Sequence, residues 1–155
     1  MPVIDRLAIV GIGLIGSSVA RAAIAHDAAG SVTLYDASTS VRKRAGEIDL
    51  GDIADTLEDC VKDADLVILC TPVGVMGHIA EDMAPHLKQG AIVSDVGSVK
   101  SAVLEAVAPH IPSSVSFIPG HPIAGTEKSG PDAGFATLFE GRWCIITPPD
   151  AHEDA

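Results

Sequence analysis

Short apolar runs alternate along this chain with longer segments in which apolar and polar residues recur at helical spacing. The apolar runs predict strands at residues 6–10, 31–35, 66–70, 91–94, 115–118 and 143–147, with a short edge strand at 53–56. The mixed segments predict helices at residues 14–25, 38–45, 57–61, 76–87 and 100–108. Strands that are apolar throughout and alternate with helices are typical of a parallel sheet covered on both sides. We therefore expect an α/β fold with a doubly wound, mostly parallel sheet.

Composition and charge narrow the kind of protein. With 155 residues, of which 47% are hydrophobic and 20% charged, the chain is long and apolar enough to fold as one globular domain. Its net charge of −11 and its small basic cluster, Arg42-Lys43-Arg44 on a predicted solvated helix face, argue against nucleic-acid binding. No leader and no apolar run of about 18 residues is visible, so we expect a cytoplasmic protein without a membrane partner.

The cysteines, Cys60, Cys70 and Cys144, are odd in number and widely spaced. A disulfide framework or a zinc site would need cysteines paired at short spacing. We therefore expect reduced thiols in a reducing compartment and no metal site.

A glycine-rich turn follows the first predicted strand. In the sequence GIGLIG, Gly11 permits the tight turn, Gly13 lets a pyrophosphate approach the backbone, and Gly16 lets helix and strand pack closely. Because the turn opens a helix whose N-terminus attracts anions, it predicts a Rossmann-type dinucleotide-binding domain. The expected cofactor-binding residues of the turn are Gly11, Ile12, Gly13, Leu14, Ile15 and Gly16. The alternative is a glycine-rich turn that binds no ligand.

Two further segments extend the predicted cofactor site. Asp36 ends the second strand, where an acid binds the adenosine ribose hydroxyls and repels a 2′-phosphate. This favours NAD over NADP, although the basic residues 42–44 leave NADP open. Thr71, Pro72 and Val73 follow the strand at 66–70, near the expected reversal of strand order, and we expect them to contact the cofactor. The alternative for these three is an ordinary strand-ending turn.

Reactive side chains gather after the strands at 91–94 and 115–118. The sequence DVGSVK carries Ser98, and GHPIAGTEKSG carries His121 in a segment with neither helical nor strand periodicity. Parallel strands place both residues at the carboxyl edge of the sheet, where a nicotinamide would lie. A histidine at that edge suits proton removal from an alcohol. The alternatives are Ser98 as the N-cap of the next helix and His121 as a structural histidine.

The motifs GIGLIGSS, DVGSVK and GHPIAGTEKSGPDAGFATLFEGRWCIITP together resemble the prephenate/arogenate dehydrogenases, the TyrA family of tyrosine biosynthesis. The third motif is long and specific, whereas the first two occur more widely among dehydrogenases. The resemblance covers essentially the whole chain and corresponds to the family's N-terminal nucleotide-binding domain. It implies NAD(P)-dependent oxidative decarboxylation of prephenate or arogenate, with hydride passing to the nicotinamide, loss of CO2 and aromatisation.

The resemblance implies roles for four residues by motif position. His121 would accept the proton of the ring hydroxyl, and Ser98 would orient that hydroxyl and His121. Thr126 and Glu127 would line or gate the substrate pocket. For Glu127 the alternative is a solvated loop carboxylate, and Lys128 is expected to be a surface charge.

The resemblance also implies a division of the protein. Residues 1–148 are expected to form the nucleotide-binding domain, and residues 149–155 a linker toward a helical domain that is absent from this chain. That domain would make the protein a homodimer and supply cations for the substrate, so this chain alone is expected to bind dinucleotide but turn over poorly. The alternatives are a β-hydroxyacid or imine-reducing dehydrogenase domain, a non-catalytic dinucleotide-binding module, and a domain that binds S-adenosylmethionine or flavin.

Overall fold

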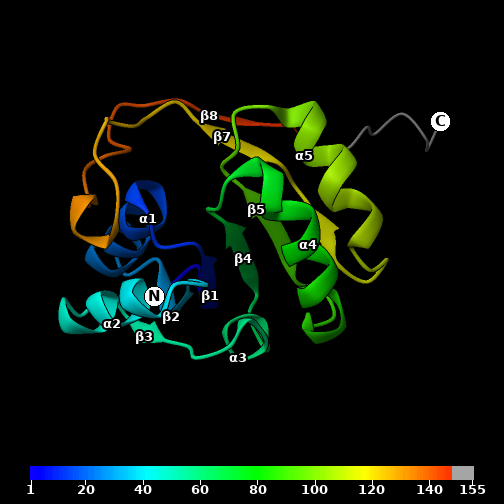
Figure 1. Ribbon diagram of the computed structural model, residues 1–155, viewed down its shortest axis with the longest axis horizontal. Coiled ribbons are helices and arrows are strands. Elements are labelled where there is room, and N and C mark those ends of the chain that lie inside the picture. Colours follow the sequence, from blue (N-terminus) through cyan, green and yellow to red (C-terminus); the bar gives the residue numbers. More distant parts are fainter. Residues whose placement is uncertain (148–155) are drawn as a thin grey trace.

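A six-stranded parallel sheet with helices on both faces forms the body of the computed structural model, which describes residues 1–147 (Figure 1). Its strands are β1 (Ile4–Val10), β2 (Ala29–Tyr35), β3 (Asp52–Ile53), β4 (Leu66–Leu69), β5 (Ile92–Asp95) and β6 (Ser116–Phe117). The helices are α1 (Leu14–Ala25), α2 (Thr39–Glu47), α3 (Leu57–Val61), α4 (Val73–Met83) and α5 (Lys100–Val107), and short 3₁₀ turns are η1 (Ala84–His86), η2 (Ala108–His110) and η3 (Pro131–Ala133). The strand order β3-β2-β1-β4-β5-β6 reverses between β1 and β4, which confirms the doubly wound α/β fold.

Local signals set most helix boundaries. α1 and α3 begin and end at the residues expected from the sequence. α2 begins one residue later than expected because Ser38 is its N-cap, with Ser38 Oγ accepting a backbone hydrogen bond at 3.4 Å. The predicted helix at 76–87 is wrong at both ends. α4 starts at Val73, directly after Pro72, and gives way to η1, since Pro85 cannot continue an α-helix.

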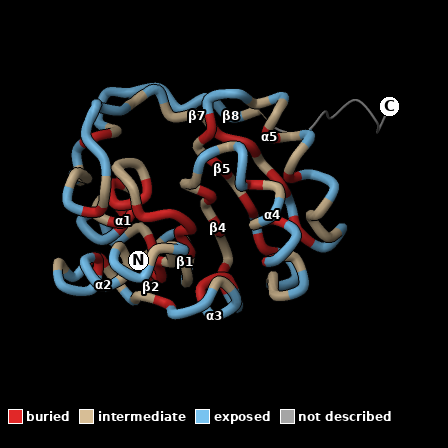
Figure 2. The backbone as a smooth tube through the Cα atoms, viewed as in Figure 1, coloured by how far each residue is buried: buried red, intermediate tan, exposed pale blue. Residues whose placement is uncertain are grey.

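Helices cover the two faces of the sheet unequally. Ile9 and Val10 face opposite sides of β1 and are 0% and 2% exposed, so helices cover this strand on both faces (Figure 2). Val93 on β5 is fully buried among residues of α4 and α5, but its neighbour Ile92 is 38% exposed. On the face of the sheet that α1 and α2 cover, these helices therefore bury β1 to β3 and leave β4 to β6 partly accessible.

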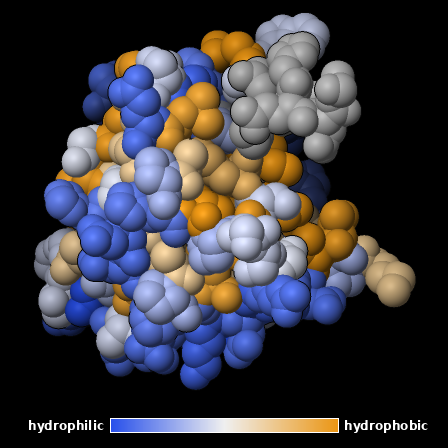
Figure 3. All heavy atoms as spheres, turned by 90° about the vertical axis from the view of Figure 1, so that its right-hand side faces the viewer, coloured by the Kyte–Doolittle hydropathy of each residue, from blue (hydrophilic) through white to orange (hydrophobic). Residues whose placement is uncertain are grey.

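On the side of the molecule formed by α4 and α5, hydrophobic residues gather in the middle and hydrophilic residues along the lower edge (Figure 3). Both helices turn their other faces to the sheet, where Met76, Met83 and Val103 are fully buried. None of the helices within residues 1–147 is long and apolar enough to cross a membrane.

A second sheet of two antiparallel strands lies over the carboxyl end of β5 (Figure 1). Its strands are β7 (Gly120–Pro122) and β8 (Cys144–Ile146), and His121 pairs with Ile145. The strand predicted at 143–147 exists, but it does not extend the parallel sheet, and the segment that begins at Gly120 opens with a short strand. Where the chain leaves the parallel sheet, Gly120 N donates a hydrogen bond to Asp95 Oδ1 at 3.2 Å.

Residues 123–143, called the strap below, run from β7 to α1 and α2 and return to β8 (Figure 1). Phe135 N donates to Ser18 Oγ at 3.1 Å, and Arg44 Nε donates to both carboxylate oxygens of Asp132 at 2.9 and 3.1 Å. Arg44 thereby lowers the pKa of Asp132 and anchors the strap, so it is more than the solvated charge expected from the sequence. Residue 148 and the predicted linker at 149–155 lie outside the described residues.

Candidate functional site

The glycine-rich turn joins β1 to α1 at the reversal of strand order. Gly11 has φ +100°, and a Cβ there would lie 2.6 Å from the carbonyl oxygen of Cys70. A Cβ at Gly16 would lie 2.0 Å from the carbonyl oxygen of Gly11. A Cβ at Gly13, by contrast, would meet nothing within 4 Å. Two glycines are therefore required by packing and conformation, whereas Gly13 faces open space that a ligand can enter.

The N-terminus of α1 presents backbone donors to that open space. Gly13 is the N-cap, and within the described chain no side chain caps this helix. The buried Ser17 and Ser18 donate their hydroxyls backward, to the carbonyl oxygens of Gly13 and Leu14 at 2.6 Å each. The first N–H groups of α1 therefore point toward any anion bound at Gly13, which is the geometry that holds a pyrophosphate. This arrangement fits the roles predicted for Gly13, Leu14, Ile15 and Gly16.

Asp36 holds the turn from the end of β2. Its carboxylate accepts hydrogen bonds from Ile12 N at 3.0 Å and from Ser38 N at 2.9 Å. The amide of Ile12, which the sequence predicts to bind cofactor, is thus committed to Asp36. Arg42 lies beside it, with Nη1 donating to the Asp36 carbonyl oxygen at 2.7 Å and the guanidinium stacked 5.5 Å from the centre of the Tyr35 ring.

A cavity of about 570 Å³ opens next to Asp36, at the carboxyl ends of β1, β2 and β4. The predicted cofactor residues that line it are Gly11, Asp36, Thr71 and Pro72. Thr71 Oγ1 is buried and has no hydrogen-bond partner among the described residues, so this wall suits a polar ligand. Val73 does not line the cavity; its side chain packs against the core beneath α4 and α5.

Three polar residues of this cavity were missed from the sequence: Glu58 on α3, Asp82 on α4 and His86 on η1. Glu58 Oε1 lies 3.7 Å from His86 Nδ1, so these two side chains meet in the cavity wall. The lining positions 75, 79, 82 and 86 recur at intervals of four, three and four, which marks one face of a helix. That spacing was the available signal, but it becomes informative only once α4 is known to begin at Val73.

The segments that carry Ser98 and His121 meet at a buried carboxylate. Asp95, at the end of β5, is 1% exposed and accepts hydrogen bonds from Gly97 N at 2.8 Å and Gly120 N at 3.2 Å. It also forms an ion pair with the ammonium group of Lys100. The residues that precede Ser98 and His121 in the chain therefore share one acceptor at the carboxyl edge of the sheet.

The remaining predicted residues have less enclosed positions. Ser98 is exposed and is not the helix cap, because Val99 occupies the N-cap position of α5. His121 is half-buried on β7. Thr126 and Glu127 are exposed on the strap, where Thr126 Oγ1 accepts a hydrogen bond from Lys128 N at 3.2 Å.

A smaller cavity, of about 220 Å³, lies beneath the β7–β8 ribbon. Its polar walls come from Ser94, Asp95 and Arg142, and its apolar walls include Phe139 and Trp143. The sequence did not assign Arg142 to the site, and the return of the strap to β8 brings this residue to the cavity.

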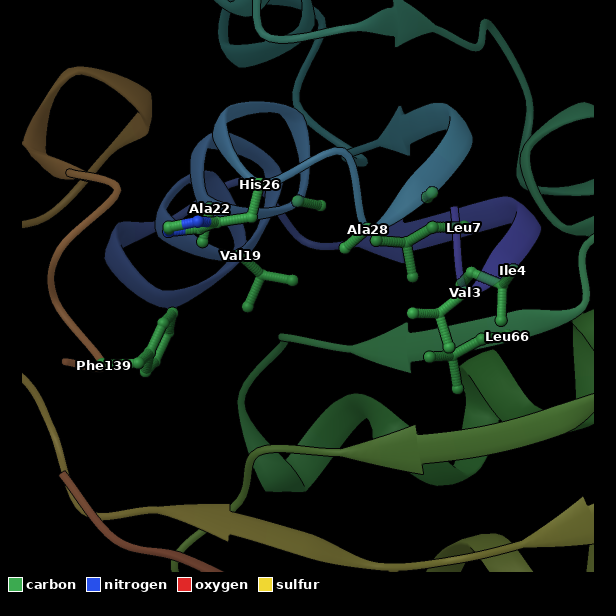
Figure 4. Close-up of a pocket in the computed structure, with 11 residues that line it drawn as sticks. Val3, Ile4, Leu7, Val19, Ala22, His26, Ala28, Leu66 and Phe139 are labelled. Carbon is green, nitrogen blue, oxygen red and sulfur yellow. The ribbon is translucent and has the colours of Figure 1, made fainter. Parts of the chain in front are cut away.

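A third cavity, of about 440 Å³, is almost wholly apolar and runs along α1 toward the amino ends of the strands (Figure 4). Phe139 lies at one end of it and Val3 and Ile4 at the other, while His26 is its titratable wall residue. Because it lacks convergent polar groups, we assign the chemistry to the other two cavities.

Comparison with known proteins gives a consistent result. Residues 19–155 match the family described as "Prephenate dehydrogenase, nucleotide-binding domain". The chain is 49% identical to the cyclohexadienyl dehydrogenase of Zymomonas mobilis over 156 residues, covering 100% of this chain and 53% of that protein. It is 35% identical to the prephenate dehydrogenase of Bacillus subtilis, covering 93% of this chain and 39% of that one. The chain thus spans about half the length, or less, of these relatives.

Solved structures agree with these matches. Prephenate dehydrogenase from A. aeolicus, in complex with hydroxyphenyl propionate and NAD+, superposes with a TM-score of 0.84 at 31% identity, covering 94% of this chain and 51% of that one. Synechocystis arogenate dehydrogenase superposes with a TM-score of 0.83 at 32% identity, covering 94% and 50%.

Proposed function

The chain belongs to the prephenate dehydrogenase family, of which it contains the nucleotide-binding domain, and from this premise we propose that it binds a nicotinamide dinucleotide and forms one half of a site that oxidises prephenate or arogenate. The observation that carries the proposal is the glycine turn. Gly13 faces open space at the start of α1. Beside it lies a cavity lined by Asp36 and by Thr71, whose hydroxyl has no hydrogen-bond partner among the described residues. A bound nicotinamide would supply the hydride acceptor.

For the cofactor we propose NAD. Asp36, Glu58 and Asp82 line the cavity of about 570 Å³, and their carboxylates would repel a 2′-phosphate bound there. Arg44 forms an ion pair with Asp132, and the Arg42 guanidinium donates to the Asp36 carbonyl oxygen. Neither side chain is therefore positioned to bind a 2′-phosphate. These contacts support NAD over NADP.

The preference is tested by titration calorimetry with NAD+ and NADP+. Asp36→Asn removes the charge and keeps an acceptor oxygen, and should lower the ratio of NAD+ to NADP+ affinity at least tenfold, the scale of one hydrogen bond to a charged group. Asp55→Ala, at an exposed position after β3, is the control. An unchanged ratio in Asp36→Asn would remove this carboxylate from the argument.

For the reaction we propose that His121 accepts the proton of the substrate hydroxyl and that Ser98 orients it. The shared carboxylate of Asp95 supports this, because it ties together the segments that carry both residues. Thr126 and Glu127 are the proposed substrate-side walls contributed by the strap.

The function is tested with the protein at its full natural length, by following NADH formation with prephenate and with arogenate. His121→Asn should lower kcat by about 10²-fold or more, the usual effect of losing a general base. His78→Asn, at an exposed position of α4, should leave kcat unchanged. Cofactor binding without turnover on either substrate would contradict the proposal and favour a non-catalytic binding module.

We also propose the domain division stated above, with residues 1–148 as the nucleotide-binding domain and 149–155 leading to a helical, dimerising domain. The support is that this chain covers 53% of its Zymomonas relative. Sedimentation of the full-length protein and of residues 1–148 tests it: a dimer is expected for the first and a monomer for the second. A monomeric full-length protein would contradict this division.

A further inference from the structure

A buried ion pair joins the end of β5 to β7. The Asp95 side chain is 0% exposed and the Lys100 side chain 16%, and the two form a salt bridge at the start of α5. A carboxylate this deep must have its lone pairs satisfied. Asp95 Oδ2 accepts from Gly97 N as well as from Lys100, and Oδ1 accepts from Gly120 N.

The pair contacts both polar groups of Gly120. The N–H of Gly120 donates to Asp95 Oδ1 at 3.2 Å, and the carbonyl oxygen of Gly120 accepts from Lys100 Nζ at 2.5 Å. That carbonyl belongs to the peptide bond between Gly120 and His121. Because the peptide group is planar, a fixed carbonyl direction also fixes where the backbone of His121 begins.

Glycine makes these contacts attainable. A Cβ at Gly120 would lie 3.0 Å from the carbonyl oxygen of Asp95, and a Cβ at Gly97 would lie 3.0 Å from Asp95 Oδ2. Side chains at either position would push the two segments apart. The motifs that contain Ser98 and His121 therefore form one hydrogen-bonded unit around the ion pair.

We propose that Asp95 and Lys100 are positioning residues that orient the Gly120–His121 peptide and thereby hold the imidazole in register with the substrate hydroxyl. This rests on the proton-accepting role proposed for His121. The pair need not touch substrate or cofactor to act, because misplacing a reacting group by about 1 Å can cost about 10²-fold in rate.

The opposite edge of the sheet provides a matched control. There Lys88 Nζ lies 2.5 Å from Asp65 Oδ1, and Asp65 Oδ2 accepts from Asp5 N at 3.1 Å and Arg6 N at 2.9 Å. It is the same arrangement of lysine, aspartate and backbone amides, with side chains 46% and 26% exposed and no hydrogen bond to β7 among the described residues. Removing Lys88 should affect the fold locally and leave kcat unchanged.

The test compares Lys100→Met with Lys88→Met in the full-length protein, at a temperature where both are fully folded. Lys100→Met leaves the buried Asp95 carboxylate without its cation, which is destabilising by itself. The double variant Asp95→Asn/Lys100→Met, which removes both charges, is therefore measured beside it. For the Lys100 variants we expect kcat per folded molecule to fall at least tenfold, with the Kd for NAD+ changed by less than about threefold. For Lys88→Met we expect both quantities to stay within about twofold.

A purely structural pair would lower the melting temperature and leave kcat per folded molecule unchanged, which would overturn the inference. Amide hydrogen exchange at Gly120 and His121 gives a readout that does not depend on turnover, and it should accelerate in the Lys100 variants only. If the unmodified protein oxidises neither substrate, the proposed function fails, and unchanged exchange at these two amides would separately refute the positioning role of Asp95 and Lys100.

Discussion

Gly13 and Gly16 provide a sharp test of the dinucleotide site because a methyl group has opposite consequences at the two positions. Gly13 has φ −95° and ψ −155°, an extended conformation open to alanine, and its Cβ would meet nothing within 4 Å. Alanine is a poorer N-cap than glycine but restricts the unfolded chain, and these effects oppose each other. We expect Gly13→Ala to change the free energy of unfolding by less than about 1 kcal/mol.

The same methyl group would occupy the space through which a pyrophosphate reaches the first N–H groups of α1. Losing one hydrogen bond to a charged phosphate costs about 1.5–3 kcal/mol. The Kd for NAD+ should therefore rise about 10- to 100-fold, since each 1.4 kcal/mol is a factor of about ten.

In Gly16→Ala the methyl group would lie 2.0 Å from the carbonyl oxygen of Gly11, so the turn itself must move. Overpacking of this kind costs about 1–3 kcal/mol, which lowers the melting temperature of a domain of this size by several degrees. Calorimetric titration with NAD+ and thermal unfolding measure both variants. Tight NAD+ binding by Gly13→Ala would refute the reasoning, as would a Gly16→Ala variant as stable as the unmodified chain.

Three further outcomes are expected. The exposed Cys144 should react with a thiol reagent in the native protein, whereas Cys60, whose pKa burial raises to about 12, should react only on unfolding, as mass spectrometry of the labelled chain would reveal. Because Arg44 lowers the pKa of Asp132 from its ordinary 3.8, this pair stabilises the fold above that pH and the effect is lost as the pH falls through the lowered pKa. Asp132→Asn should therefore reduce the melting temperature more at pH 7 than at pH 2.5, and equal reductions at both would contradict the pairing. Phe117→Ala, at a position 6% exposed in the core, should destabilise the chain by about 3–5 kcal/mol in urea unfolding, and a loss below about 1 kcal/mol would contradict that burial.

The sequence was sufficient for features that depend on neighbouring residues. Apolar runs and glycine spacing located the sheet, the turn at Gly11 and the bounds of α1, because period and backbone conformation are local properties. Topology then brought Asp36 and Thr71 into one cavity, as a reversal of strand order requires.

Features set by distant partners were not predictable in the same way. The first strand of the β7–β8 ribbon is tied by the Gly120 amide to Asp95, which is 25 positions away. Arg44 binds Asp132, which is 88 positions away, so no pattern of neighbouring residues predicts that it anchors the strap. The N-cap interpretation of Ser98 was wrong because Val99 is the N-cap of α5, a shift of one residue that local patterns do not resolve.

The long-range anchors of the strap also predict an order of assembly. Its anchors join residues 88 and 117 positions apart, whereas each βαβ unit of the sheet closes over a much shorter stretch of chain. Closing a longer loop costs more conformational entropy, and its contacts reward the chain only after their distant partners are in place. We therefore expect the glycine turn and the sheet to form first, and the ribbon that carries His121 to dock last. During synthesis, the dinucleotide-binding turn should then be folded before the ribbon packs onto the end of β5.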